Sequence, residues 1–247
     1  MKENKYDDER FFGEYSRFPR SVEGLSAAGE WHELQKMLPD FRGKRVLDIG
    51  CGFGWHCVYA AEHGAAYVLG TDISEKMLAA AREKTNSPNV EYRRTAMEDI
   101  DFPARSFDVV LSSLAFHYTP DWEGVCERIC KCLVPGGDFV FSAEHPVFTA
   151  YGTQDWIHDG DGVRRHWPVD RYFEEGKRDA VFLGERVVKY HRTLTEYLGT
   201  LWKAGFEVTG FVEPRPEARL LDAVPGMRDE LRRPMMMLVS AKKKKAG

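Results

Sequence analysis

Short apolar segments alternate with amphipathic ones along most of the chain. Segments rich in β-forming residues predict strands at residues 45–49, 67–72, 90–94, 107–112 and 138–142. The segments between them have apolar residues at helical spacing, so that these residues share one face of each predicted helix. The fourth predicted strand contains the continuous apolar run Val109–Leu111, as a central parallel strand requires. We therefore predict βα units that build a mostly parallel sheet.

Helix-start residues precede the amphipathic segments. Ser21 and Ser74 are predicted N-caps, because a serine hydroxyl can accept a hydrogen bond from the first helical turn. Pro120 suits the first position of a helix, where its missing N–H costs nothing. The predicted helices cover residues 21–38, 53–63, 74–81, 120–133 and 193–204.

The regular alternation stops after the fifth predicted strand. Residues 144–184 are rich in Trp, His, Tyr, Gly and Asp and show no long apolar period. A strand is possible at residues 187–191, and two more are predicted at residues 206–212 and 235–241. The Pro- and Arg-rich segment 213–234 is expected to be a surface loop, so the chain ends in a hairpin-like pair without a crossover helix.

The composition is typical of a soluble enzyme. The formal net charge is −4, whereas a dedicated nucleic-acid binder carries a basic field. The basic block Lys242–Lys245 is expected to be a solvated tail, with a polyanion contact as the alternative. Neither a signal-peptide pattern nor an apolar run near the ~18 residues of a membrane span occurs. We therefore expect a cytoplasmic protein that has no membrane contact.

The cysteines are odd in number and lack the spacing of an extracellular disulfide framework. They are Cys51, Cys57, Cys126, Cys130 and Cys132. The pair at 130 and 132 lacks the usual zinc spacing, and no second pair accompanies it. We expect reduced thiols that mainly pack in the core, and no metal site.

The most specific pattern is the run Val46–Gly54, in which glycines follow an apolar strand at positions 50, 52 and 54. Such glycines let the backbone turn tightly against a ligand, and the helix that follows offers free N–H groups to an anion. Asp72 lies 22 residues after Gly50, at the end of the next strand. A carboxylate there can accept both hydroxyls of a ribose. The pattern predicts a nucleoside-binding βαβ unit, with an ordinary strand–turn–helix as the alternative.

Two ligand classes compete for such a unit. A nicotinamide dinucleotide site has glycines in the spacing G-x-G-x-x-G, but Trp55 occupies the third of these positions. Its indole would obstruct the close helix–strand approach that the last glycine permits. The run Asp48–Gly54 instead resembles the first motif of class I S-adenosylmethionine-dependent methyltransferases. Ser106–Ser113 and Leu133–Gly137 resemble the fourth strand of that family and the turn before its fifth.

The resemblance implies an α/β fold with a Rossmann-like sheet of seven strands, mostly parallel. The last strand is expected to be antiparallel and to enter between the fifth and sixth, with helices on both faces. It further implies a single domain over residues 1–247. Within this domain, residues 1–42 are expected to form a helical and aromatic arm, and residues 144–191 a substrate-covering insertion (lid) after strand five. The aromatic residues of the arm, among them Tyr6 and Tyr15, and Arg17 or Arg20 could close over the cofactor; a surface arm is the alternative.

S-adenosylmethionine is the cofactor that the resemblance implies. Its methionine part is expected against Gly50, Cys51 and Gly52, and its ribose at Asp72. The positions expected beside adenine or near the sulfonium are Ile73, Met77, Met97, Glu98, Ser112, Ser113 and Leu114. The two methionines have plain core packing as their alternative. Relatives often carry an acid where this chain has Ala96, so the neighbouring backbone or Glu98 would contact the adenine amine.

A methyl group on a sulfonium already has a good leaving group, so the protein mainly aligns the nucleophile for in-line SN2 transfer. A base is needed only where the methyl acceptor must lose a proton. His145, after strand five, is the first catalytic candidate, and His117, after strand four, is the second. A structural role is the alternative for each. The substrate-binding candidates are Glu144, Trp156, Tyr172 and His191, with a small satellite core as their alternative.

The methyl acceptor is expected to be a small molecule. A nucleic-acid substrate is disfavoured, because Ser112–Ala115 lacks the Asn/Asp-Pro-Pro-aromatic sequence of enzymes that methylate base amines. A nicotinamide-dependent oxidoreductase and a non-catalytic nucleoside-binding regulatory module are the alternative functions. The sequence leaves the oligomeric state and the identity of the acceptor open.

Overall fold

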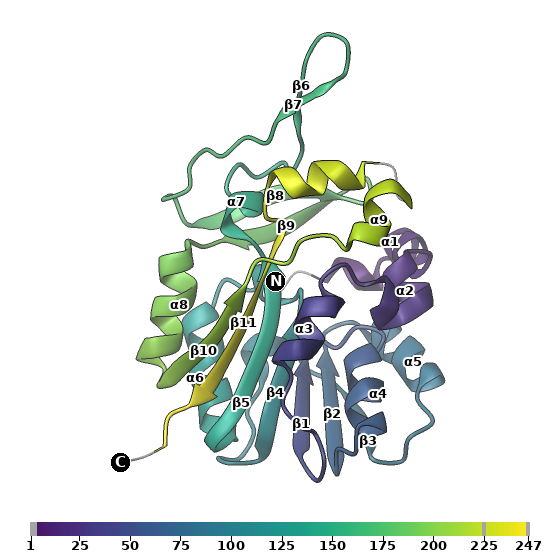
Figure 1. Cartoon of the computed structure of the whole chain (residues 1–247). Helices are drawn as coiled ribbons and strands as arrows, with labels where there is room; N and C mark the ends of the chain where they lie inside the picture. Colours follow the sequence, from purple (N-terminus) through teal and green to yellow (C-terminus); the bar gives the residue numbers. More distant parts are fainter. Residues whose placement is uncertain (1–3, 224–225, 246–247) are drawn as a thin grey trace.

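The computed structural model describes residues 4–223 and 226–245. A seven-stranded sheet in the order β10-β11-β5-β4-β1-β2-β3 forms its centre (Figure 1). The strands are β1 (Arg45–Ile49), β2 (Tyr67–Asp72), β3 (Val90–Arg94), β4 (Phe107–Ser113), β5 (Leu133–Glu144), β10 (Phe206–Val212) and β11 (Met236–Lys243). β1 to β5 pair in parallel, whereas β11 is antiparallel to both β5 and β10. The predicted fold class is confirmed, including the position of the last strand.

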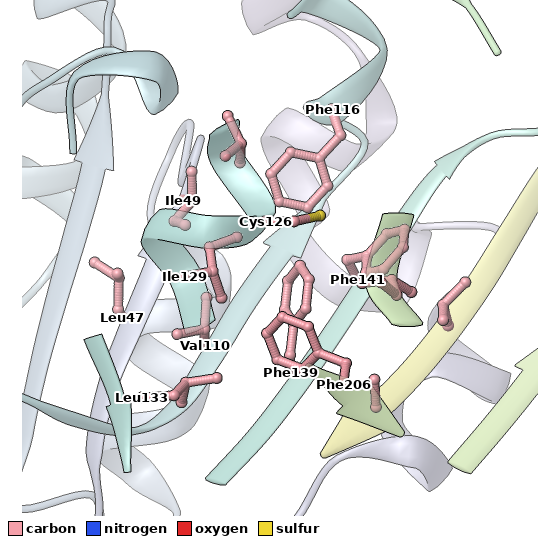
Figure 2. Close-up of a cluster of buried hydrophobic side chains, with 14 of the residues drawn as sticks. Leu47, Ile49, Val110, Phe116, Cys126, Ile129, Leu133, Phe139, Phe141 and Phe206 are labelled. Atoms are coloured by element: carbon pink, nitrogen blue, oxygen red, sulfur yellow. The ribbon is translucent and has the colours of Figure 1, made fainter. Parts of the chain in front are cut away.

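Helices cover both faces of the sheet, because successive residues of a strand point to opposite sides. Val46 packs in one cluster with residues of α3 (Trp31–Met37), α4 (Trp55–Glu62) and α5 (Glu75–Lys84). Leu47, its neighbour, packs in the other cluster with α6 (Trp122–Cys132) and α8 (Leu194–Lys203). Figure 2 shows this second cluster, in which Cys126 and Ile129 face the sheet. The continuous apolar strands are thus buried on both sides.

Two predicted helix starts need correction, and one is confirmed. The hydroxyl of Ser74 accepts a hydrogen bond from the Met77 N–H at 3.1 Å, as expected of an N-cap. α6 begins later than predicted, because Asp121 caps it by accepting from the Gly124 N–H at 3.0 Å. Ser21 caps no helix. It lies inside α2 (Pro19–Glu23), which starts at a proline.

The N-terminal arm consists of several short elements, where a longer helix from Ser21 was predicted. They are η1 (Lys5–Asp7), α1 (Glu9–Ser16), α2 and η2 (Gly24–Ala27), followed by α3. Gly24 has a φ of +71°, and this left-handed conformation ends α2. The arm therefore folds back in steps across the ends of the strands rather than standing as one rod (Figure 1).

The insertion after β5 is more regular than the sequence indicated. It contains α7 (Pro146–Thr149) and the strand pairs β6 (Ile157–His158) with β7 (Arg164–His166) and β8 (Gly176–Phe182) with β9 (Glu185–His191). The prediction of irregular structure at β8 was wrong. Arg178 and Ala180 are the buried residues of this strand, so it shows no apolar period. The β6–β7 hairpin projects from the rest of the molecule (Figure 1).

The segment between β10 and β11 was expected to be a surface loop, and this is partly wrong. It contains α9 (Ala218–Ala223) and η5 (Met227–Arg232). Arg233 anchors the segment to the insertion, because its guanidinium carbon lies 4.2 Å from the Trp167 ring centre and 4.7 Å from that of Phe148. Such cation–π contacts stabilise an otherwise polar segment.

The expectation of a solvated lysine tail also fails for its first half. Lys242 and Lys243 belong to β11. Lys242 pairs with Asp138, and the Lys243 ammonium donates to the carbonyls of Cys130 and Leu133 at the end of α6. In the described part of the chain, no helix is both long enough and apolar enough to cross a membrane.

Candidate functional site

A cavity of about 370 Å³ lies beyond the carboxyl ends of β1, β2, β4 and β5. Its walls come from the sheet, from the N-terminal arm and from the β8–β9 hairpin. This edge is where open α/β sheets bind ligands, and the volume is within the range of small-molecule sites, ~300–1,000 Å³. The register places the loop after β1 beside the end of β2, since the N–H groups of Gly50 and Cys51 both donate to the Thr71 carbonyl, at 2.8 and 2.9 Å.

The glycine loop forms the floor of the cavity. Gly50 has a φ of +68°, and a Cβ there would lie 2.6 Å from the Cβ of Ala115, so no larger residue fits. Gly52 has a φ of +53°, and a Cβ there would meet no atom within 4 Å. The space in front of Gly52 is therefore open, as a loop that lies against a ligand requires.

Asp72 lines the cavity at the carboxyl end of β2. Its Oδ2 accepts a hydrogen bond from the Gly52 N–H and its Oδ1 one from the Ser74 N–H, each at 2.9 Å. These bonds fix the carboxylate, and each oxygen keeps a further lone pair. Burial raises the pKa of Asp72, while the two N–H donors act in the opposite direction. The side chain is thus a positioned hydrogen-bond acceptor that still faces a ligand space.

All but one of the other residues predicted to bind the cofactor also line this cavity. The cavity-lining members are Gly50, Cys51, Gly52, Ile73, Met77, Met97, Glu98, Ser113 and Leu114. Ser112 is buried and does not line the cavity, because its hydroxyl donates to the Ile49 carbonyl at 2.7 Å. It fastens β4 to β1 beneath the glycine loop.

A network of charged side chains closes the opposite end of the cavity. Lys189 of β9 is 2% exposed, and Glu144 at the end of β5 is 8% exposed. The Lys189 ammonium donates to Glu144 Oε1 at 2.5 Å and to Gln154 Oε1 at 2.7 Å, and Gln154 Nε2 donates to Glu144 Oε2 at 2.6 Å. Burial alone would raise the pKa of Glu144, but His117 and Lys189 outweigh it and hold the pKa below its usual value. Glu144 is therefore an anion at neutral pH.

His117 lies next to this carboxylate and lines the same end of the cavity. Its Nε2 is 3.9 Å from Glu144 Oε1, and its Nδ1 accepts from the Glu144 N–H at 3.5 Å. Because Nδ1 accepts, the neutral ring carries its proton on Nε2. Burial lowers the pKa of His117 to about 4, so the ring is neutral at physiological pH.

Four of the predicted residues lie outside the cavity lining. His145 is buried, accepts from the Val147 N–H at 3.1 Å and so caps α7; its Nε2 is 3.0 Å from Glu213 without hydrogen-bond geometry. His191 bonds Thr149 and the Tyr172 carbonyl at 2.7 and 2.8 Å. Trp156 packs on Trp167 within the insertion, with ring centres 5.3 Å apart. These contacts hold the insertion together, and none of the four side chains lines the cavity.

Tyr6, Tyr15 and Arg20 of the arm line the cavity, as considered from the sequence. Several other lining residues were not identified from the sequence, and they include Glu30, His56, Tyr118, Phe182 and Lys189. Tyr6 and Tyr118 exchange a hydrogen bond between hydroxyls at 3.2 Å, which joins the arm to the segment after β4. The aromatic bias of the arm was the signal for Tyr6 and Tyr15, and the sequence offers no such signal for the others. Across residues 4–223 and 226–245, no group of three or more His, Cys, Asp or Glu has the arrangement of a metal site.

Comparison with known proteins agrees with this architecture. The family profile described as "Methyltransferase domain" matches residues 47–141. A Haemophilus influenzae protein described only as uncharacterized is 30% identical over 249 residues, 96% of each chain. The ubiquinone biosynthesis O-methyltransferase of Neisseria meningitidis serogroup C is 30% identical over 187 residues, which cover 63% of this chain and 78% of that enzyme.

Two solved structures are closer in sequence. An S-adenosylmethionine dependent methyltransferase from Mesorhizobium loti is 45% identical with a TM-score of 0.82, and the match covers 89% of this chain and all of that one. A Listeria monocytogenes protein, assigned provisionally to the same class, is 57% identical with a TM-score of 0.86 and covers 90% of this chain and all of that one.

Proposed function

Because the chain belongs to the class I S-adenosylmethionine-dependent methyltransferases, we propose that its cavity holds this cofactor along the glycine loop and Asp72. We further propose that a small-molecule methyl acceptor binds at the end lined by Glu144 and Lys189. S-adenosylmethionine is the cofactor of the family members that this chain matches.

The observation that supports the cofactor site most strongly is the pairing of Asp72 with Gly52. The carboxylate is held by two backbone N–H groups and still lines the cavity. The open space in front of Gly52 adjoins it. A ribose diol that donates to the remaining lone pairs of Asp72 would gain roughly 1.5–3 kcal/mol for each hydrogen bond to the ionised group. Ile73 and Met77 would then face the apolar surface of adenine.

The bound cofactor supplies a methyl group on a sulfonium, with a neutral thioether as the leaving group. What remains for this chain is to orient the acceptor atom and to remove its proton where it has one. Glu144 is the anionic side chain of the acceptor end. We assign Glu144 two roles: it accepts the hydrogen bond from the O–H or N–H of the methyl acceptor, and it takes up the proton that this group loses on methylation. His117, which carries its proton on Nε2, acts as a hydrogen-bond donor in this assignment.

Two features support a small acceptor. The cavity of about 370 Å³ has to hold the cofactor as well, which leaves room for a compact molecule only. The relative from Neisseria meningitidis is named for O-methylation in ubiquinone biosynthesis, which is a small-molecule reaction. Aromatic side chains at this end, among them Tyr118 and Phe182, favour an acceptor with an apolar or aromatic surface.

We also propose a reducing compartment, such as the cytoplasm, as the place of action. All five cysteines are free thiols, and four of them are buried. Buried thiols in this number are typical of a protein that is not exposed to oxidising conditions.

Calorimetric titration with S-adenosylhomocysteine tests the cofactor site. We expect Asp72→Ala to weaken binding at least roughly tenfold, about 1.4 kcal/mol, while the thermal unfolding curve stays cooperative. Asp101→Asn is the matched control, since this exposed acid pairs only with Lys131 in the described part of the chain. An unchanged affinity in Asp72→Ala would remove the ribose role from this residue. A separate screen of small metabolites with labelled S-adenosylmethionine would identify the methyl acceptor.

A further inference from the structure

A second set of polar residues meets where the N-terminal arm crosses the ends of β1 and β4. Its members are Arg20, Ser21, Glu30, His56 and Ser113, and all of them line the cavity. α2, the turn before α3, the start of α4 and the end of β4 each contribute to it. We call these five residues the arm cluster. In the described part of the chain, the ion pair and hydrogen bonds that join these residues do not involve Asp72, Glu144 or Lys189.

The cluster is organised around one ion pair. Arg20 Nη1 lies 2.9 Å from Glu30 Oε1, and Arg20 Nη2 donates to the Ser113 hydroxyl at 2.7 Å. The Ser113 hydroxyl is 3.2 Å from the same Glu30 oxygen. The Glu30 side chain is 1% exposed and that of Arg20 is 21% exposed. Burial alone would raise the pKa of Glu30, but Arg20 and the hydrogen bonds outweigh it and lower the pKa.

Three atoms of this cluster are buried without a hydrogen-bond partner among the described residues. They are Glu30 Oε2, Ser21 Oγ and His56 Nε2. Buried polar atoms are nearly always hydrogen-bonded, so three such atoms in one wall of a ligand cavity need an explanation. A ligand that bonds to them supplies one. Burial lowers the pKa of His56 to about 4, so this ring is neutral and can donate or accept.

The cluster presents two charges of opposite sign to the same space. The guanidinium of Arg20 has five N–H donors, and the two contacts above engage only part of them, so others remain for a carboxylate. Glu30 keeps one carboxylate oxygen for a cation. A ligand group that satisfies both has to carry an anion and a cation a few ångströms apart, as the α-carboxylate and α-ammonium of an amino acid do.

We propose that the arm cluster binds the amino-acid end of S-adenosylmethionine, with Arg20 on the carboxylate and Glu30 on the ammonium. This inference rests on the proposed cofactor site, which fixes the adenosine at Asp72 and directs the other end of the cofactor along the glycine loop. The arm then recognises the cofactor directly.

The test compares two thioethers that share the adenosine. S-adenosylhomocysteine has the amino-acid end, and 5′-methylthioadenosine lacks it. By calorimetry on the full chain, the wild type should bind the first at least about tenfold more tightly. Glu30→Gln and the double variant Arg20→Met/Glu30→Gln should reduce this preference by about tenfold, and the affinity for 5′-methylthioadenosine should change by less than about twofold. The double variant removes both charges, so neither is left buried alone.

Arg17→Met is the matched control, because Arg17 is an exposed arginine of the same arm that pairs with Glu14 at 3.1 Å. It should leave both affinities unchanged. If the variants weaken both ligands equally, or leave the preference intact, the assignment of the arm cluster is overturned. If the wild type binds neither ligand, the proposed cofactor site itself fails. Retained binding of 5′-methylthioadenosine shows that a variant is folded.

Discussion

A buried carboxyl group lies near each end of the cavity, and the pKa values of the two groups are shifted in opposite directions. Asp48, in β1 directly before the glycine loop, is 1% exposed and receives a hydrogen bond from the Cys57 thiol at 3.3 Å. Burial raises the pKa of Asp48 to about 7. Glu144, at the other end, has Lys189 as its partner, and its pKa is lowered. Arg20 opposes the rise at Asp48 only in part, whereas Lys189 is in direct contact with Glu144.

This difference follows from how each end is built. The proposed cofactor end consists of consecutive strands and the loops after them, and its glycine loop presents mainly backbone atoms to the cavity. The acceptor end combines β5, the segment after β4 and the β8–β9 hairpin, so its charges have to be matched across segments far apart in the chain. Backbone atoms of the sheet and its loops suit a ligand that all members of a family share. The side chains of the acceptor end come from separate segments, so they can differ between proteins while the sheet stays the same.

The largest effect is expected from Lys189→Met. This change leaves Glu144 buried without its cation, and breaking a buried ion pair in this way costs about 3–5 kcal/mol. Chemical denaturation should show the loss as a lower midpoint at unchanged slope. The cofactor end should be unaffected, so the remaining folded protein should bind S-adenosylhomocysteine as the wild type does.

The double variant Lys189→Met/Glu144→Gln sharpens this result. Removing both charges should recover most of the lost stability, because no unpaired charge remains. If the double variant is as unstable as the single one, the charge pairing at the acceptor end is not what stabilises it.

A smaller effect is expected from Asp48→Asn, and it should depend on pH. The pKa of Asp48 is about 7 in the folded protein and ~3.9 in an unfolded chain. Because the folded value is the higher one, the wild type loses stability as the pH rises from about 4 to about 7. The asparagine variant lacks this loss, so its advantage should grow over the same window, up to roughly 4 kcal/mol.

Thermal unfolding of both proteins at pH 5 and pH 8 measures this difference. Asp108→Asn provides the opposite case, since Arg45 lowers the pKa of Asp108 through hydrogen bonds at 3.0 and 3.2 Å. This variant should be less stable than the wild type at pH 8. A difference between Asp48→Asn and the wild type that is the same at both pH values would show that Asp48 is ionised throughout.

The smallest effect concerns the open space at Gly52. Alanine there has to adopt a φ of +53° and places its Cβ in front of the loop, where the cofactor is proposed to lie. We expect Gly52→Ala to weaken S-adenosylhomocysteine binding about tenfold, equivalent to about 1.4 kcal/mol. Gly162→Ala is the matched control, because Gly162 also has a positive φ, +78°, and open space, but lies on the β6–β7 hairpin. Equal binding by the two variants would contradict the placement of the ligand against the loop.

Most of the sheet and the cofactor end could be predicted from the sequence. Continuous apolar runs define buried strands, and the spacing from Gly50 to Asp72 is a local property of one βαβ unit. The family resemblance implied the antiparallel last strand, and the ending without a crossover helix agreed with it; this strand is confirmed. Gly52 and Asp72 act through backbone geometry and a strand end, and both are visible in a linear pattern.

The acceptor end could not be predicted in the same way. Lys189 belongs to a strand whose register against β8 is set by tertiary contacts, and nothing local indicates that its ammonium reaches Glu144. His145 follows a strand end, as a ligand-binding residue should, but its ring turns to cap α7. Arg20 and Glu30 meet only because Gly24 ends α2 and redirects the arm. Sequence spacing carries little information about such contacts.

A crystal structure of the complex with S-adenosylhomocysteine tests the central claim most directly. We predict both ribose hydroxyls within hydrogen-bond distance of the Asp72 carboxylate, ~2.5–3.0 Å, and the thioether chain along Gly50 to Gly52. A nucleoside bound elsewhere in the molecule, or a ribose that makes no contact with Asp72, would contradict the account.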